Sequence, residues 1–147
     1  MPILIRPASL YDIPAILAIE RNAPSASHWS LEQYKKLIDD NSIRIAEDEK
    51  ALCGFISTKA VAGQWEIENV VVAIDNLRRG VADALFRDLL QRARQDAVSA
   101  VLLEVRQSNL PARQLYEKHG FSMAGLRRGY YQNPAEDAIH YTLHFNQ

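Results

Sequence analysis

The stretch 66–93 combines a strand, a turn with two arginines and a helix, and these residue types suit the binding of an anion. Arg78, Arg79 and Gly80 form the turn, and the apolar residues that follow recur at i, i+4 and i+8, as on one face of a helix. Unpaired backbone N–H groups converge at a helix N-terminus, where the helix dipole adds partial positive charge. The stretch predicts a phosphate site, although a plain strand-to-helix connection has the same pattern.

The other reactive side chains do not indicate a second catalytic or metal site. His140 and His144 share a predicted strand face but lack a third convergent ligand, so no metal site is expected. No Ser-His-Asp or Cys-His arrangement is readable, which disfavours covalent catalysis. Cys53 has no partner for an internal disulfide, so a reducing, cytoplasmic compartment is expected.

Length and charge limit the possible partners. A chain of 147 residues predicts one domain, residues 1–147, with a substantial core. The net charge of −1 provides no overall field that would favour nucleic acid or a membrane surface. Basic residues cluster locally, which favours a localised anionic ligand; the clusters are Arg78 with Arg79, Arg92 with Arg94, and Arg127 with Arg128. The apolar runs are too short to span a membrane, and the first residues lack a signal-peptide pattern.

Strands and helices are expected to alternate along the chain. Strands are predicted at 3–6, 43–46, 51–61, 64–73, 98–105, 121–126 and 138–145. Helices are predicted at 13–20, 31–38, 81–93 and 110–119, and a polar loop at 127–137. This order indicates an α/β fold, a mixed central sheet of about six to seven strands with helices on both faces.

Cap residues mark two of these helices. Ser30 with Gln33 forms a capping box, and Trp29 is placed to pack on Tyr34 as a hydrophobic staple. Asn109 caps the later helix, which ends in a glycine suited to a C′ position. Because the segment between the first two strands often overhangs a binding site, Trp29 and Tyr34 could line a substrate groove; core packing is the alternative.

Four separated motifs match one pattern: 68–72 (ENVVV), 78–82 (RRGVA), 103–109 (LEVRQSN) and 115–121 (LYEKHGF). Together they resemble the GNAT N-acetyltransferases over essentially the whole chain. The last two motifs, followed by RRGYY at 127–131 and EDAI at 136–139, are similar to the RimI-type branch, which acetylates protein N-termini. The stretch HWSLEQY at 28–34 also resembles that branch.

The resemblance implies that the anion is acetyl-CoA. Its binding residues would be Val70, Val71, Val72, Leu77, Arg78, Arg79, Gly80, Val81, Ala82 and Asn109. The three valines would present backbone groups to the pantetheine arm, and the turn would hold the pyrophosphate. Leu77 departs from the family, which has Gln or Arg at this position, so a side-chain contact from there is in doubt.

The resemblance also assigns the chemistry. Glu104 would be the general base and Tyr116 the general acid, with Glu68 as a second candidate for the base. Strand alternation places Glu104 on the face opposite Leu103, where it could instead pair with Arg106 or another cation. For Tyr116 the alternative is a packed core tyrosine. Two further tyrosines, at 130 and 131, would line the peptide groove, or would be ordinary surface residues.

The expected acceptor is the N-terminal α-amine of a protein, with a ribosomal protein that begins with alanine as the first candidate. An α-amino group has a pKa of about 7.7–8.0 and lysine of about 10.4, so an α-amine needs only modest help to lose its proton at pH 7. Direct attack on the thioester is expected. A lysine side chain or a small amine remains an alternative acceptor, and a non-catalytic acyl-CoA-binding module is the alternative of another class.

Overall fold

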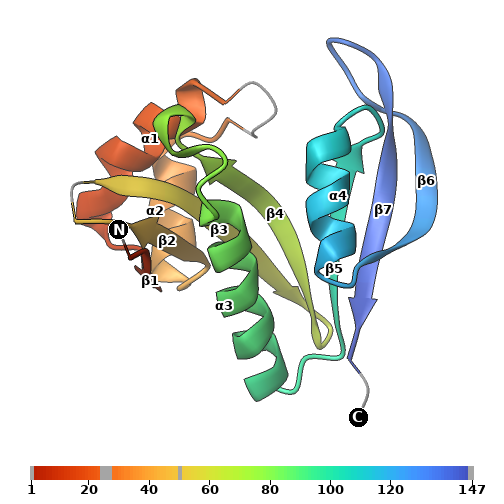
Figure 1. Ribbon diagram of the computed structural model, residues 1–147, viewed down its shortest axis with the longest axis horizontal. Coiled ribbons are helices and arrows are strands. Elements are labelled where there is room, and N and C mark those ends of the chain that lie inside the picture. Colours follow the sequence, from red (N-terminus) through yellow and green to blue (C-terminus); the bar gives the residue numbers. More distant parts are fainter. Residues whose placement is uncertain (1, 24–27, 50, 146–147) are drawn as a thin grey trace. The chain divides into compact units, whose positions relative to one another are not determined.

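The computed structural model describes residues 2–23, 28–49 and 51–145. Parts of the connection between the first two predicted helices and of that between the predicted strands 43–46 and 51–61 lie outside the described residues. A seven-stranded sheet has the order β1-β2-β3-β4-β5-β7-β6 (Figure 1). The strands are β1 (Leu4–Pro7), β2 (Ile43–Glu47), β3 (Leu52–Val61), β4 (Gln64–Val72), β5 (Ala100–Arg106), β6 (Ser122–Tyr131) and β7 (Glu136–His144). The helices are η1 (Leu10–Asp12), α1 (Ile13–Arg21), α2 (Leu31–Asp39), η2 (Ile74–Asn76), α3 (Val81–Gln95) and α4 (Leu110–Lys118). The predicted α/β class and element order are confirmed.

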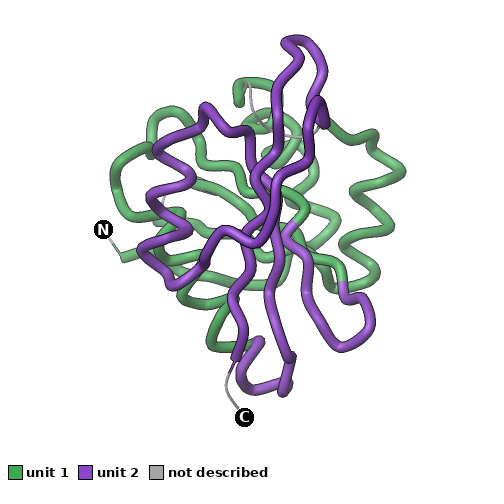
Figure 2. The backbone as a smooth tube through the Cα atoms, turned by 90° about the vertical axis from the view of Figure 1, so that its right-hand side faces the viewer, with its two compact units in different colours: residues 1–59, 68–92 green, residues 60–67, 93–147 purple. Residues whose placement is uncertain are grey.

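The chain divides into two compact units (Figure 2). The first comprises residues 1–59 and 68–92, and the second comprises residues 60–67 and 93–147. Each is described by itself below. Among the described residues, no helix is both long and apolar enough to cross a membrane.

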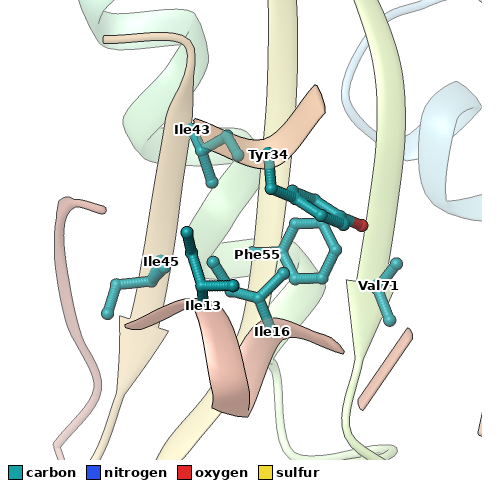
Figure 3. Close-up of a cluster of buried hydrophobic side chains, with 7 residues drawn as sticks. All are labelled: Ile13, Ile16, Tyr34, Ile43, Ile45, Phe55 and Val71. Atoms are coloured by element: carbon teal, nitrogen blue, oxygen red, sulfur yellow. The ribbon is translucent and has the colours of Figure 1, made fainter. Parts of the chain in front are cut away.

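The core of the first unit is built from isoleucines and aromatic rings of five elements (Figure 3). Tyr34 of α2 and Phe55 of β3 are fully buried, and their rings meet edge to face at 6.1 Å. The rest of the cluster is Ile13, Ile16, Ile43, Ile45 and Val71. Removal of these side chains from water is the main stabilising contribution of this layer, because apolar burial is worth about 25 cal/mol per Å².

Neighbouring residues of β3 contact helices on opposite faces of the sheet in the first unit. Phe55 belongs to the cluster with α1 and α2, whereas a Cβ atom at Gly54 would lie 3.0 Å from Val81 of α3. Because successive strand residues point to opposite faces, α3 covers the face opposite α1 and α2. The prediction of helices on both faces is therefore confirmed in this unit.

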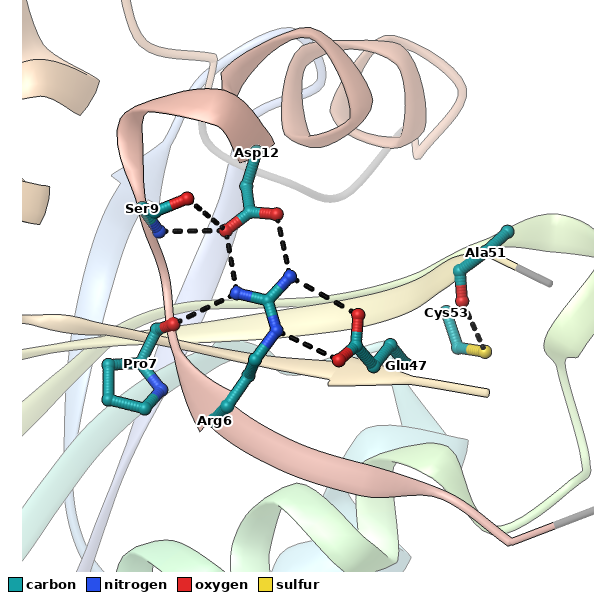
Figure 4. Close-up of polar contacts among 7 residues, drawn as sticks. All are labelled: Arg6, Pro7, Ser9, Asp12, Glu47, Ala51 and Cys53. Atoms are coloured by element: carbon teal, nitrogen blue, oxygen red, sulfur yellow. Dashed lines mark hydrogen bonds and ion pairs between the residues drawn. The ribbon is translucent and has the colours of Figure 1, made fainter. Parts of the chain in front are cut away.

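Arg6 joins the first strand to the first helix and to β2 (Figure 4). Its guanidinium donates two hydrogen bonds of 2.9 Å to Asp12, and two of 2.8 and 3.2 Å to Glu47. Asp12 also accepts a hydrogen bond from the backbone N–H of Ser9 at 2.7 Å, which starts the helical segment. The Arg6 interactions lower the pKa of the Asp12 carboxyl.

The second unit is a sheet of β5, β7 and β6 in which both neighbouring pairs are antiparallel. The predicted polar loop at 127–137 is wrong in extent, because residues 127–131 continue β6 and the turn spans only 132–135. β6 lies at the end of the strand order and nearly all its side chains are exposed. An exposed edge strand needs no alternating apolar pattern, so its sequence resembles that of a loop.

The predicted ends of α4 are confirmed. The side chain of Asn109 accepts a hydrogen bond from the N–H of Ala112 at 3.3 Å. At the other end Gly120 has φ +95°, and the N–H of Phe121 donates to the carbonyl of Tyr116 at 3.1 Å. Together with the bond from Gly120 to Glu117, this is a Schellman motif, which satisfies the last carbonyls of the helix.

Candidate active site

The turn before α3 offers exposed donors with the backbone shape of an anion site. Arg78 has φ +65° and Gly80 has φ +79°, while Arg79 between them is exposed. Left-handed residues in such a turn can direct consecutive N–H groups toward one point. α3 begins at once, since the N–H of Ala84 donates to the carbonyl of Gly80 at 3.0 Å. These features fit the phosphates of acetyl-CoA, and Leu77, whose side chain is 55% exposed, adds no polar group.

Strand β3 packs closely against the end of β4. Val71 has its side chain in the core, while Val70 and Val72 are half-buried on the other face. A Cβ atom at Gly54 would lie 2.7 Å from the carbonyl oxygen of Val71, closer than real contacts allow. Gly54 is thus the residue that lets β3 approach this segment and Val81. The sequence reasoning missed it, although an isolated glycine within a strand pattern signals a close backbone approach.

Glu104 of β5 has one paired and one unpaired carboxylate oxygen. Oε1 lies 3.3 Å from Nε of Arg127, a residue of β6 whose side chain is 60% exposed. Oε2 is buried and has no hydrogen-bond partner among the described residues. Buried polar atoms are nearly always satisfied, so this exception needs an explanation, and Oε2 is a hydrogen-bond acceptor that the described residues leave unused.

The sequence left open whether Glu104 pairs with Arg106 or with another cation, and the structure pairs it with Arg127. Arg106, two residues farther along β5, instead binds Glu136 at 3.4 Å and stacks over the ring of Tyr131 at 4.4 Å. The sequence could not choose between them, because Arg127 lies on a strand two places away in the sheet.

Tyr116 of α4 is held between two aromatic rings. Its ring centroid is 6.0 Å from that of Tyr141 and 6.2 Å from that of Phe121. Burial, with smaller effects of Tyr131 and Tyr141, raises the pKa of Tyr116 to about 12. The phenol therefore keeps its proton at neutral pH. The packed tyrosine and the proton donor that the sequence left as alternatives are compatible here.

Glu104 and Tyr116 lie on opposite faces of the sheet in the second unit. Tyr141, which contacts Tyr116, is the register partner of Leu103, so Leu103 points to the α4 face. Glu104 follows Leu103 directly in an unbroken stretch of strand and points the other way.

The two tyrosines at the end of β6 stack with arginines. Tyr130 is half exposed and lies 5.3 Å below the guanidinium of Arg127, and its ring is 5.1 Å from that of Tyr131. Tyr131 lies under Arg106. They belong to a strand rather than to the predicted loop, and their contact with a peptide stays a prediction.

Of the two residues predicted to line a substrate groove, Tyr34 lies in the core and Trp29 is partly accessible. Tyr34 is fully buried, and its hydroxyl donates to the buried carboxylate of Glu20. Trp29 is half-buried, and its ring meets Tyr34 at 5.5 Å, as the staple prediction requires. This burial favours core packing over substrate contact for Tyr34. Glu68, the second candidate for the base, is half-buried in β4, and its rank against Glu104 stays a prediction.

The three predicted basic clusters include arginines that already bind carboxylates of the same protein. Arg92 binds Asp88 at 2.9 Å, and Arg127 binds Glu104, so these two are already paired with carboxylates. Whether any of the three clusters binds an anion stays a prediction. Within the described part of the chain, no group of three or more His, Cys, Asp or Glu side chains could hold a metal ion.

Comparison with known proteins identifies the family of the chain. Residues 10–121 match the model of the acetyltransferase (GNAT) family. The chain is 33% identical over 132 residues to the ribosomal protein bS18-alanine N-acetyltransferase of Escherichia coli K12, covering 87% of this chain and 88% of that protein.

Solved structures have the same fold. The crystal structure of the ribosomal-protein-S18-alanine N-acetyltransferase from Escherichia coli superposes with a TM-score of 0.88 at 28% identity, covering 99% of this chain and 96% of that one. The NatC complex bound to Gag peptide and CoA gives a TM-score of 0.86 at 20% identity, covering 99% of this chain and 100% of that one. The second likeness shows the fold alone.

Proposed function

The chain belongs to the acetyltransferase (GNAT) family and is an acetyl-CoA-dependent N-acetyltransferase, and from that premise we propose that it acetylates a ribosomal protein at an N-terminal alanine. The similarity to enzymes that act on ribosomal protein bS18 supports this acceptor.

Glu104 is the proposed base. The acceptor must lose a proton before or during its attack, and Oε2 of Glu104 is the buried carboxylate oxygen with no hydrogen-bond partner in the described residues. Arg127 holds the other oxygen, so the carboxylate has a defined orientation. A protein α-amine is the acceptor class that such a single carboxylate can serve, because its pKa is close to neutral.

Tyr116 is the proposed proton donor. Acetyl-CoA supplies the acetyl group as a thioester, and the leaving sulfur carries negative charge as the bond to carbon breaks. A thiol has a pKa of about 8.5, well below that of a tyrosine. With its pKa raised to about 12, Tyr116 is expected to donate a hydrogen bond to the sulfur while keeping its proton.

The proposed cofactor site is the turn before α3 with the end of β4. Its backbone N–H groups and the side chains of Arg78 and Arg79 would bind the phosphates of acetyl-CoA. The side chain of Asn109 caps α4, so Asn109 would contact the cofactor at the N-terminus of that helix. Leu77 would make no polar contact, and backbone groups would compensate for it.

The observation that carries the proposal is the Oε2 atom of Glu104, which has no hydrogen-bond partner within the described ranges, in a chain of this family. The test uses labelled acetyl-CoA and matched peptides that begin with alanine and contain one internal lysine. One peptide has a free α-amine, one has a blocked α-amine, and one has the lysine replaced. Label on every peptide with a free α-amine, and on no blocked one, is expected.

Other outcomes identify the alternatives. Label on the blocked peptide would show transfer to lysine. Binding of acetyl-CoA without any transfer, to peptides or to small amines, would indicate a non-catalytic module. A preference for alanine over glycine, serine or methionine at the first position would support the ribosomal acceptor.

A further inference from the structure

Tyr141 of β7 is a buried tyrosine whose hydroxyl reaches α4. Its side chain is fully buried, although the ordinary pattern for tyrosine is a buried ring with an exposed hydroxyl. Nε of Arg113 donates to the hydroxyl oxygen at 3.1 Å, and the hydroxyl donates to Oε2 of Glu117 at 2.7 Å. Both partners belong to α4, one turn apart on the same helix face.

The chemistry of the partners fixes the direction of this hydrogen-bond chain. A guanidinium can only donate, and an ionised carboxylate can only accept. The proton of Tyr141 must therefore point at Glu117, and Arg113 must point at the oxygen. A second N–H of Arg113 donates to the backbone carbonyl of Gln107 at 2.8 Å, in the turn between β5 and α4. The start of α4 and its middle are thus tied to one phenol of β7.

The ring of Tyr141 also contacts the ring of Tyr116, the proposed proton donor. It meets the ring of Tyr116 at 6.0 Å in an edge-to-face arrangement. Tyr116 lies between Arg113 and Glu117 in sequence, so the hydroxyl of Tyr141 binds the same helix turn that carries Tyr116. A small displacement of this turn would move the Tyr116 hydroxyl, and misplacement by about 1 Å can cost about a hundredfold in rate.

We propose that Tyr141 is a positioning residue for Tyr116, acting through the hydrogen bonds of its hydroxyl with Arg113 and Glu117. This inference rests on the proposed role of Tyr116 as proton donor. Tyr141 does not touch a substrate in this scheme; it sets where the phenol of Tyr116 lies. Arg113 and Glu117 serve by holding the Tyr141 hydroxyl in one orientation.

The test is a double-mutant cycle on acetyl transfer to an alanine peptide. Tyr141→Phe removes the hydroxyl and keeps the ring that packs on Tyr116. We expect kcat to fall about tenfold with the KM for acetyl-CoA unchanged, because the phenol is less well placed. In the Tyr116→Phe background, Tyr141→Phe should have no further effect. Tyr11→Phe is the matched control, since Tyr11 is 96% exposed.

A conservative variant separates positioning from general stability. Glu117→Gln keeps an acceptor for the Tyr141 hydroxyl and should retain kcat within about twofold, whereas Glu117→Ala should behave like Tyr141→Phe. Melting temperatures of all variants are measured alongside, so that rates are compared below unfolding. Equal losses from Tyr141→Phe with and without the Tyr116 hydroxyl would overturn the inference, as would an unchanged kcat.

The two proposals can fail separately. If Tyr116→Phe lowers kcat and Tyr141→Phe does not, the proton donor stands and the positioning role is refuted. If Tyr116→Phe leaves kcat unchanged, the proposed donor itself is wrong, and the positioning role falls with it.

Discussion

Nε of Arg127 lies 3.3 Å from Oε1 of Glu104, whereas Oε2 of the same carboxylate is buried without a hydrogen-bond partner in the described part of the chain. The arginine side chain is largely exposed and the glutamate side chain is largely buried. An ion pair with one exposed member contributes only about 0–1 kcal/mol to stability. The pairing is therefore better explained by orientation of the carboxylate than by stability.

Substitution of Glu104 and of Arg127 should have unequal effects. Glu104→Gln removes the base and should lower kcat about a hundredfold, with a larger loss at lower pH, where more of the amine is charged. Arg127→Gln removes only the ion pair and should cost less than about tenfold. Steady-state kinetics from pH 6 to 9 measure both. Equal losses would mean that the ion pair, and not the base, accounts for the lower rate. If Glu68→Gln is nearly inactive while Glu104→Gln remains active, Glu68 rather than Glu104 is the base.

Loss of the Tyr116 hydroxyl should affect turnover rather than cofactor affinity. Tyr116→Phe keeps the ring between Tyr141 and Phe121, so the fold should be retained. We expect kcat to fall about 10- to 100-fold, because one donor to a developing charge is lost. Calorimetric titration with acetyl-CoA should give an unchanged Kd. A normal rate for this variant would exclude Tyr116 as the donor.

The turn before α3 can be tested with a matched pair of glycines. Gly80 and Gly63 both have φ +79°, and an added Cβ would meet nothing within 4 Å at either site. Alanine at each should cost about 1 kcal/mol of stability from backbone strain. Only Gly80→Ala should weaken acetyl-CoA binding, and a bulkier residue there should abolish it. Equal affinities of Gly80→Val and Gly63→Val would contradict the phosphate site.

Gly54 provides a test of the packing behind β4. An added Cβ would collide with the carbonyl oxygen of Val71 at 2.7 Å, and this backbone atom cannot move without shifting β4. Gly54→Ala should destabilise the protein by about 1–3 kcal/mol and raise the Kd for acetyl-CoA. Gly125→Ala is the control, because its Cβ would make an ordinary 3.9 Å contact. Urea unfolding and titration are the measurements, and a fully stable Gly54→Ala would refute the close approach.

The Arg6–Asp12 pair predicts a loss of stability in acid. The hydrogen bonds from Arg6 lower the pKa of Asp12 in the folded state. A lowered folded-state pKa gives stability that is present above the unfolded pKa of about 3.9 and is lost as the pH falls through the folded value. The Tm of Asp12→Asn should lie below that of the wild type at pH 7, and the difference should shrink toward pH 3. Exposed Asp96 serves as the control, and a gap independent of pH would contradict the assignment.

Local features of the sequence were enough to predict most of the helices and strands and the caps of two helices. Ser30 and Gln33 form the expected capping box, and Asn109 and Gly120 bound α4 as expected, because each of these signals acts within a few residues. The turn at Arg78–Gly80 was also readable, since its arginines, glycine and following helix are contiguous. The family resemblance then supplied the chemistry of Glu104 and Tyr116.

Contacts between distant residues were decided by the tertiary structure. β7 lies between β5 and β6, which brings Arg127 rather than the adjacent Arg106 to Glu104. The same strand carries Tyr141, which the sequence did not single out, to the α4 turn that bears Tyr116. Residues 127–131, the second half of β6, were predicted as loop, because an exposed edge strand has no buried face to impose an apolar alternation. The sequence by itself determined what short-range hydrogen bonding and hydrophobic periodicity can encode. The partner of each ionised or buried polar side chain depended on strand order and register, which arise only when the whole sheet assembles.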